Sequence, residues 1–264
     1  MVPGRGVKNP VLTYQHVSDI PATFVADPFM VWDNDVWYMF FEILNTETGN
    51  GEIGLATSFD GVNWTYRQVV LREPYHLSYP YVFQINKQFY MAPETLMAGS
   101  IRLYKATLFP IKWEAANSLV PGKLADPSLF YYEGTWWMFA CPRPYHHDTL
   151  RLYYARDLSG PWLEHSANPV ITGNRRMARP AGRVVVLENE MIRFTQDCYP
   201  EYGNAVRAFR ITKLTPTCYE EEEVSVSPIL SSTGTGWNAS GMHHIDPHRT
   251  KEGRWIACVD GLSD

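Results

Sequence analysis

Side chains that could carry acid–base chemistry recur in this chain at a constant spacing. The pairs lie 15 positions apart and are Asp27 with Glu42, Tyr79 with Glu94, and Asp126 with Cys141. Four of these six residues are acids, and two carboxyl groups held near each other can act as general acid and as general base or nucleophile at a glycosidic bond. The spacing therefore predicts carboxylate chemistry on a sugar at one position of a repeated structural unit.

The elements that would position these acids are short β-strands. Aromatic-rich runs at residues 36–41, 89–92 and 135–140 each follow a tight turn rich in Asn, Asp or Gly, which is typical of β-hairpins. A strand, a turn and a Trp then follow in each unit, at Trp64, Trp113 and Trp162. A repeat of about 50 residues built from four strands is the signature of a β-propeller.

Five such units can be counted, and together they predict a single domain over residues 1–264. The inner strands are expected to begin near Asp27, Tyr79, Asp126, Arg179 and His244. The fifth unit ends early, after residues 255–260. We therefore expect residues 10–17 to form a strand that completes the last blade and closes the ring, which would remove an open sheet edge.

Composition excludes several classes of partner. The chain has 264 residues, a formal net charge of −5 and no Lys/Arg stripe, so a nucleic-acid partner is not expected. No apolar stretch approaches the ~18 residues of a membrane helix, so membrane insertion is not expected either. The N-terminus shows no signal peptide and the four cysteines form no CxxC pair, which favours a cytoplasmic protein. The sequence does not indicate an oligomeric state.

The 15-residue offset spans one hairpin, so the two ends of each pair should meet at the same mouth of the ring. One central cavity would then collect six acids, namely Asp27, Glu42, Glu94, Asp126, Asp197 and Asp260. Crowded carboxylates raise each other's pKa, as acid–base catalysis on a sugar requires. The same mouth should hold further residues that bind substrate: Tyr79, Arg179, His243 and His244.

Several short motifs give a resemblance to known propellers. Residues 58–64 resemble the Ser-x-Asp-Gly-x-x-Trp turn of the five-bladed glycosidases of glycoside hydrolase family 43. Residues 40–42, 93–94, 196–198 and 242–246 are more similar to the family-43-like N-terminal domain of plant glucosamine inositolphosphorylceramide transferases and its bacterial homologues. This resemblance extends over nearly the whole chain and implies a five-bladed propeller that acts on a carbohydrate.

The glycosidase resemblance implies roles for individual residues. Asp27 would be the general base or the nucleophile, and Asp126 would orient the general acid. That acid is a Glu of the fourth blade in family 43, but this chain has Gln196 and Asp197 there. Glu201, Glu94 or Glu42 would have to replace it, and we expect Glu201 first and Glu94 next. We expect a glycosidase; the alternatives are a glycosyltransferase or its accessory domain, and a non-catalytic carbohydrate-binding propeller.

Other polar motifs have structural interpretations. An Asp-Pro pair can cap a strand, and the acidic run at residues 220–223 is expected to be a solvated face. The His-rich segments at residues 146–148 and 243–248 lack HExxH or Cys-rich zinc spacing, so no metal site is predicted from them. The glycosidase resemblance implies that His244 would be the ligand if a central Ca2+ were present.

Overall fold

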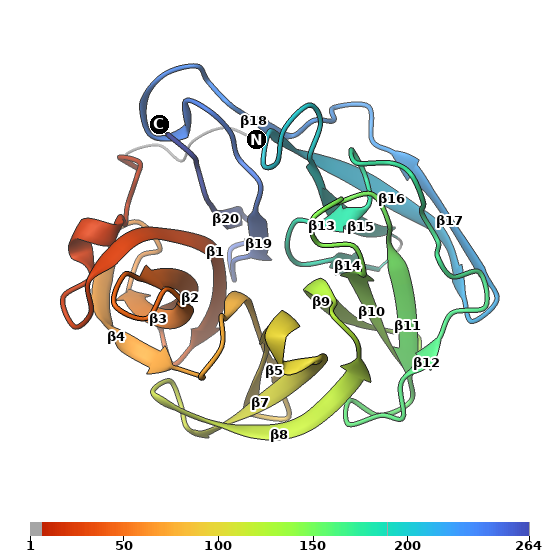
Figure 1. Cartoon of the computed structure of the whole chain (residues 1–264), viewed down its shortest axis with the longest axis horizontal. Helices are drawn as coiled ribbons and strands as arrows, with labels where there is room; N and C mark the ends of the chain where they lie inside the picture. The colour runs from red at the N-terminus through yellow and green to blue at the C-terminus, as the bar shows by residue number, and fades with distance from the viewer. Residues whose placement is uncertain (1–6, 189, 264) are drawn as a thin grey trace.

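The computed structural model describes residues 7–188 and 190–263, and its strands form separate antiparallel sheets around a central axis (Figure 1). The first three sheets have four strands each, ordered β1-β2-β3-β4, β5-β6-β7-β8 and β9-β10-β11-β12. Their bounds are β1 (Ala22–Asp33), β2 (Val36–Asn45), β3 (Gly51–Ser58), β4 (Thr65–Leu71), β5 (Ser78–Ile85), β6 (Gln88–Glu94), β7 (Ser100–Leu108), β8 (Lys112–Pro121), β9 (Ala125–Tyr132), β10 (Thr135–Cys141), β11 (Arg151–Ala155) and β12 (Leu163–Glu164).

The last two sheets differ in size. The fourth has six strands and the fifth has two. Their bounds are β13 (Arg179–Pro180), β14 (Val185–Leu187), β15 (Glu190–Asp197), β16 (Ala205–Thr215), β17 (Cys218–Glu223), β18 (Leu230–Ser231), β19 (Ile245–Arg249) and β20 (Trp255–Val259). Short 3-10 turns are η1 (Tyr14–His16), η2 (Leu96–Ala98) and η3 (Gly236–Asn238). Five sheets around one axis define a five-bladed β-propeller, so the predicted fold class is confirmed.

The inner strands of the first three blades share an unusual backbone conformation. Asp27, Tyr79 and Asp126 have φ values of 52°, 48° and 52°, and each precedes a proline. Left-handed backbone is uncommon outside glycine, and a following proline favours extended backbone instead. The strand register shifts at each of these positions, which is a β-bulge. A bulge changes the direction in which its side chain points. The same backbone feature therefore occurs at all three positions that the 15-residue repeat singled out.

The pairing on either side of these bulges explains the 15-residue offset. Ala26 pairs with Glu42, Ser78 with Glu94, and Ala125 with Cys141. Each bulged residue therefore lies next to the end of the second strand of its own blade, as the hairpin argument predicted.

The ring is closed differently from the prediction. Residues 10–17 form no strand in the part of the chain that the structure describes, and Tyr14–His16 is the short turn η1. Leu12 and Val17 instead pack as apolar side chains against a cluster that contains Met30 and Cys258. The expectation of an N-terminal strand in the last blade is wrong, because this segment covers the junction by side-chain packing rather than by strand pairing.

Polar contacts near the axis join the blades. Nε of Arg183, which follows β13, donates to Oδ1 of Asp246 on β19 at 2.6 Å, and its Nη2 donates to the carbonyl oxygen of Val82 at 2.8 Å. The other oxygen of Asp246 accepts the Met30 N–H at 2.6 Å. These bonds link blades one, two, four and five, and they add to the apolar packing between blades.

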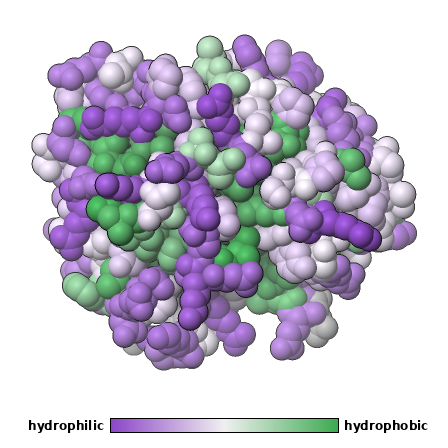
Figure 2. All heavy atoms as spheres, turned by 90° about the horizontal axis from the view of Figure 1, so that it is seen from below, coloured by the Kyte–Doolittle hydropathy of each residue, from purple (hydrophilic) through white to green (hydrophobic). Residues whose placement is uncertain are grey.

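The outer surface is mostly polar, and one predicted surface feature lies inside. From the side, hydrophilic residues cover most of the molecule and apolar side chains show between them (Figure 2). The acidic run forms part of β17, where Glu221 pairs at 2.6 Å with the buried Arg193. The expectation that the whole run is solvated is therefore wrong for Glu221. Among the described residues, no helix is long and apolar enough to cross a bilayer.

Candidate functional site

Four residues from three blades form the first part of the site, here called the arginine cluster: Glu94, Asp126, Arg179 and Gln196. Nε of Arg179 donates to Asp126, and its Nη2 lies 3.7 Å from Glu94 Oε2. The Gln196 amide nitrogen donates to Asp126 Oδ2 and to the carbonyl oxygen of Pro180, both at 2.9 Å. The Asp126 N–H donates to Glu94 at 3.2 Å. One guanidinium therefore compensates two buried carboxyl groups.

The electrostatics of this cluster act strongly on Glu94 and Arg179. Burial and the neighbouring Asp126 carboxylate hold the pKa of Glu94 well above its ordinary value, although Arg179 opposes them. Burial also acts on Arg179 and would lower its pKa, but the nearby carboxylates outweigh burial and raise the pKa well above its usual value. Glu94 therefore keeps a proton to higher pH than an ordinary glutamate does, and Arg179 stays charged.

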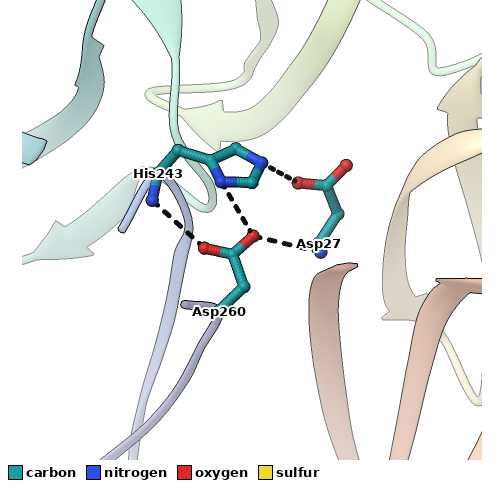
Figure 3. Close-up of side chains that lie close together, drawn as sticks. All are labelled: Asp27, His243 and Asp260. Atoms are coloured by element: carbon teal, nitrogen blue, oxygen red, sulfur yellow. Dashed lines mark hydrogen bonds and ion pairs between the residues drawn. The ribbon is translucent and has the colours of Figure 1, made fainter. Parts of the chain in front are cut away.

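The second part of the site is the histidine cluster: Asp27, His243, His244 and Asp260 (Figure 3 draws all but His244). His243 lies between two carboxylates, with Nε2 3.3 Å from Asp27 Oδ1 and Nδ1 3.2 Å from Asp260 Oδ2. Asp260 also accepts the backbone N–H groups of His243, His244 and Asp27 at 3.0–3.3 Å. Asp260 thus fixes the chain on both sides of the junction between blades five and one.

The carboxylates of the histidine cluster favour the protonated, positively charged form of His243. Burial alone would lower the pKa of His243, but the carboxylates of Asp260 and Asp27 outweigh it and raise the pKa to about 9. Burial would likewise raise the pKa of Asp27, and His243 and His244 reverse this so that the pKa is lowered. The histidine cluster is therefore a negatively charged site that favours a positive charge between the carboxylates of Asp27 and Asp260.

Tyr202 connects the two clusters. Its ring lies 5.1 Å from the ring of His147 and 5.2 Å from that of His243, and the Arg179 guanidinium lies over it at 4.9 Å. The side chain is 43% exposed, whereas the groups below it are largely buried. Tyr202 is thus a partly exposed aromatic surface beside both clusters, of the kind that can stack on a sugar ring. The sequence analysis missed it; its position next to Glu201 in a loop at the fourth blade was the available signal.

Two predicted site residues are close to the clusters but have other partners. Glu42 bonds to Nε2 of His76 at 3.1 Å. Asp197 forms ion pairs with Arg176 at 3.1 Å and with Arg207 at 2.7 Å, which tie β15 to its neighbouring segments. Asp197 is therefore a structural ion-pair centre of the fourth blade.

Of two further predicted site residues, Tyr79 does not agree with the expectation, and Glu201 lies in a loop. Tyr79 is completely buried, and its hydroxyl is 2.7 Å from Ser128 Oγ, because the bulge turns its side chain into the core. Its ring is therefore not open to a substrate. Glu201 is exposed in the loop at residues 199–203. A carboxyl at a loop tip is not positioned by the strand repeat, so the predicted approach of Glu201 to Asp27 stays a prediction.

The fold and this mouth place the protein among the five-bladed propellers whose central residues come from successive inner strands. The chain matches the family "Glucosamine inositolphosphorylceramide transferase 1, N-terminal" over residues 4–262, and it belongs to this family. This confirms the resemblance drawn from the motifs.

Curated relatives agree with this assignment. The chain is 38% identical to glucosamine inositolphosphorylceramide transferase 1 of Oryza sativa subsp. japonica and 34% identical to that of Arabidopsis thaliana. Each match covers 97% of this chain but only 36% and 34% of the respective relative. The chain thus spans about a third of the length of these proteins.

Solved structures share the fold. A glycosyl hydrolase from Bacteroides ovatus matches with a TM-score of 0.74 and 10% identity, over 98% of this chain and 89% of that one. A thermostable family-43 glycoside hydrolase matches with a TM-score of 0.60 and 15% identity, over 77% and 76%. At such low identity these likenesses concern the fold alone.

The prediction of a glycosidase is wrong. The relatives that are 38% and 34% identical to this chain over the matched region are named as transferases, not hydrolases. The site agrees with the correction, because Gln196 stands where the glycosidase resemblance requires a carboxylic acid. The alternative of a glycosyltransferase or its accessory domain is the better supported interpretation.

Proposed function

We propose that this propeller is the sugar-recognition domain of a glycosyltransferase. Family membership and the names of the curated relatives support a role in glycosyl transfer. Because the chain matches about a third of each relative, we assign recognition, rather than the whole transfer reaction, to this domain.

One observation carries the proposal: Gln196 is a fixed hydrogen-bond donor at the centre of the mouth. Its amide nitrogen is committed to Asp126 and to the Pro180 carbonyl, and an amide does not release a proton at ordinary pH. Arg179 donates to both oxygens of the Asp126 carboxylate and orients it. An amide at this position cannot carry out the proton transfers of hydrolysis, whereas carboxylate acceptors that Gln196 and Arg179 hold in place suit the binding of hydroxyl groups.

The relatives' name suggests the ligand. It contains glucosamine and an inositol-bearing lipid, so we propose that the mouth binds an amino sugar or the inositol ring of a headgroup. The acidic residues beside Arg179 can accept hydrogen bonds from hydroxyl or ammonium groups, and the exposed ring of Tyr202 offers an apolar surface to a sugar face.

Calorimetric titration of the purified chain tests this proposal. Glucosamine, N-acetylglucosamine, glucose, myo-inositol and myo-inositol phosphate would be compared. We expect saturable binding of at least one, and a weakening of about tenfold or more in Tyr202→Ala. Tyr14→Ala is the matched control, since Tyr14 is 45% exposed but lies in η1, outside the site. Absence of binding by every ligand, or an equal loss in both variants, would contradict the proposal.

A further inference from the structure

Four arginines lie at the mouth where the third blade meets the fourth: Arg143, Arg175, Arg176 and Arg179. Three of them have a carboxylate partner, in the pairs Arg143 with Asp148, Arg176 with Asp197 and Arg179 with Asp126. Nε of Arg175, by contrast, is buried and has no acceptor among the residues that the structure describes. A buried donor without an acceptor is costly, so this position calls for a ligand atom that accepts.

Backbone contacts hold Arg175 between the two blades. The N–H of Asn174, directly before it, donates to the carbonyl oxygen of Asp148 at 3.1 Å, in the loop after β10. The N–H of Cys198, directly after β15, donates to the carbonyl oxygen of Arg175 at 2.9 Å. Gln196 of the arginine cluster is two residues from Cys198. The backbone of Arg175 is therefore fastened to the mouth and does not belong to a freely projecting loop.

His147 offers a second donor at this corner of the mouth. Its Nδ1 lies 3.0 Å from Nη1 of Arg179, which can only donate, so Nδ1 accepts and Nε2 carries the proton. The pKa of His147 is lowered to about 4 by burial and by the charges of Arg179 and Arg175. Asp126 opposes this effect and His146 adds to it. The neighbouring carboxylates therefore do not cancel the positive charge of the arginines at His147.

We propose that Arg175 and His147 bind a phosphoryl group, attached to the ring that the mouth recognises. A guanidinium offers its N–H groups in a fork that matches the oxygens of a phosphate. The ring of Tyr202 lies between the rings of His147 and His243, at 5.1 and 5.2 Å, so a ring stacked on it has the arginines on one side. The histidine cluster, with its two carboxylates, would repel a phosphate on the other side.

This inference deepens the proposed function and rests on it for the ring that carries the phosphate. Two sources share the chemistry. One is the phosphate ester of an inositol headgroup, and the other is the diphosphate of an activated sugar. Both present anionic phosphoryl oxygens, and the probes of the experiment separate them.

Calorimetric titration at low salt tests the site with myo-inositol, myo-inositol 1-phosphate, UDP and inorganic phosphate. We expect at least one of the two organic phosphates to bind at least about tenfold more tightly than myo-inositol, and Arg175→Gln to lose this preference. Preference for UDP would assign the phosphate to an activated sugar, and preference for myo-inositol 1-phosphate to a headgroup. Arg156→Gln is the matched control, because Arg156 is exposed and follows β11 at the end of the blade away from the mouth.

NMR of His147 gives a second measurement that uses the wild-type chain. An anion bound beside this ring should raise its pKa by about one unit or more in saturating inorganic phosphate. An unchanged titration of His147 would place the phosphate elsewhere and overturn the proposal. Circular dichroism of each variant would show that a lost preference is not lost folding, and the wild-type NMR result stands even where a variant does not fold.

Other results would also overturn the proposal. One is equal affinity of the wild type for myo-inositol and for both organic phosphates, together with Tyr202-dependent binding of the rings; it would leave the proposed function intact. Another is an equal loss of preference in Arg156→Gln and Arg175→Gln, which would show attraction by net charge alone. The reverse result, in which no ring binds but inorganic phosphate binds and depends on Arg175, would support the phosphoryl site and contradict sugar recognition.

Discussion

The main-chain N–H of Asp126 donates a hydrogen bond to the carboxylate of Glu94, 3.2 Å away, across the boundary between blades two and three. The N–H of Asp27 donates to Asp260 at 3.3 Å in the same way, between blades five and one. In both cases an acid at the end of a second strand holds the bulged residue of the next inner strand. Glu94 and Asp260 therefore hold neighbouring blades together, in addition to lying at the mouth.

Replacement of Glu94 tests this fastening role. Glu94→Ala leaves the buried N–H of Asp126 without an acceptor, and an unsatisfied buried group costs about 1–3 kcal/mol of unfolding free energy. Glu94→Gln keeps an acceptor and should cost clearly less. Urea unfolding of both variants measures the difference. Equal stability of the alanine and glutamine variants would show that the hydrogen bond does not hold the blades together.

The repeat predicted much of the fold because it reports on local pairing. The 15-residue spacing gave the hairpins, the inner strands and the meeting of Asp27 with Glu42, since antiparallel register follows from the turn. It could not predict the contact between Arg183 and Asp246, which are 63 positions apart and meet only after the ring has formed. Nor could it exclude a strand at residues 10–17, because an apolar run does not show whether it pairs or only packs.

The distinction between local strand pairing and long-range contacts also applies to the site. Asp126 and Arg179 occupy equivalent positions of their blades, so the repeat brought them to one mouth. Glu201 lies in a loop, and the strand period does not determine where a loop side chain points. Glu221 was assigned to solvent from composition, but it belongs to a strand and pairs with the buried Arg193. A charged run alone does not reveal such a partner.

Arg183 offers a test of the axial contacts. Arg183→Met keeps most of the side chain's volume but removes the guanidinium that pairs with the fully buried Asp246 and donates to the Val82 carbonyl, so that His248 is the side chain left beside Asp246 among the described residues. Removing one partner of a buried ion pair typically costs about 3–5 kcal/mol. Thermal and urea unfolding measure the effect.

The control for this variant is Arg210→Gln. Arg210 makes two ion pairs on the outside of the fourth blade, with Glu190 and Glu222. Exposed pairs contribute little to stability, so this variant should unfold almost as the wild type does. A loss as large as that of Arg183→Met would show that the axis has no special role.

His76 links the carboxylate of Glu42 to the loop before the second blade. Its Nε2 lies 3.1 Å from Glu42 Oε1, and its Nδ1 accepts the N–H of Gly51 at 2.8 Å. The hydrogen bond to Glu42 raises the pKa of His76, burial opposes this, and the charges of Glu42 and Asp27 add to the increase. Burial is the main cause that raises the pKa of Glu42, although His76 opposes it.

We expect these two groups to make stability fall as the pH rises. A histidine whose folded pKa exceeds its unfolded value of about 6.5 contributes stability that is complete below that value and is lost as the pH rises through the folded pKa. A carboxyl with a raised pKa acts in the same direction at lower pH. In Glu42→Gln the pKa of His76, followed by NMR, should fall, and the decline of unfolding free energy above pH 6.5 should become shallower. Glu73 lies in the same loop as His76, and its carboxylate accepts a hydrogen bond from the Tyr104 hydroxyl. Glu73→Gln is therefore the control and should leave the titration of His76 unchanged. An unaltered His76 titration in Glu42→Gln would remove Glu42 as the cause.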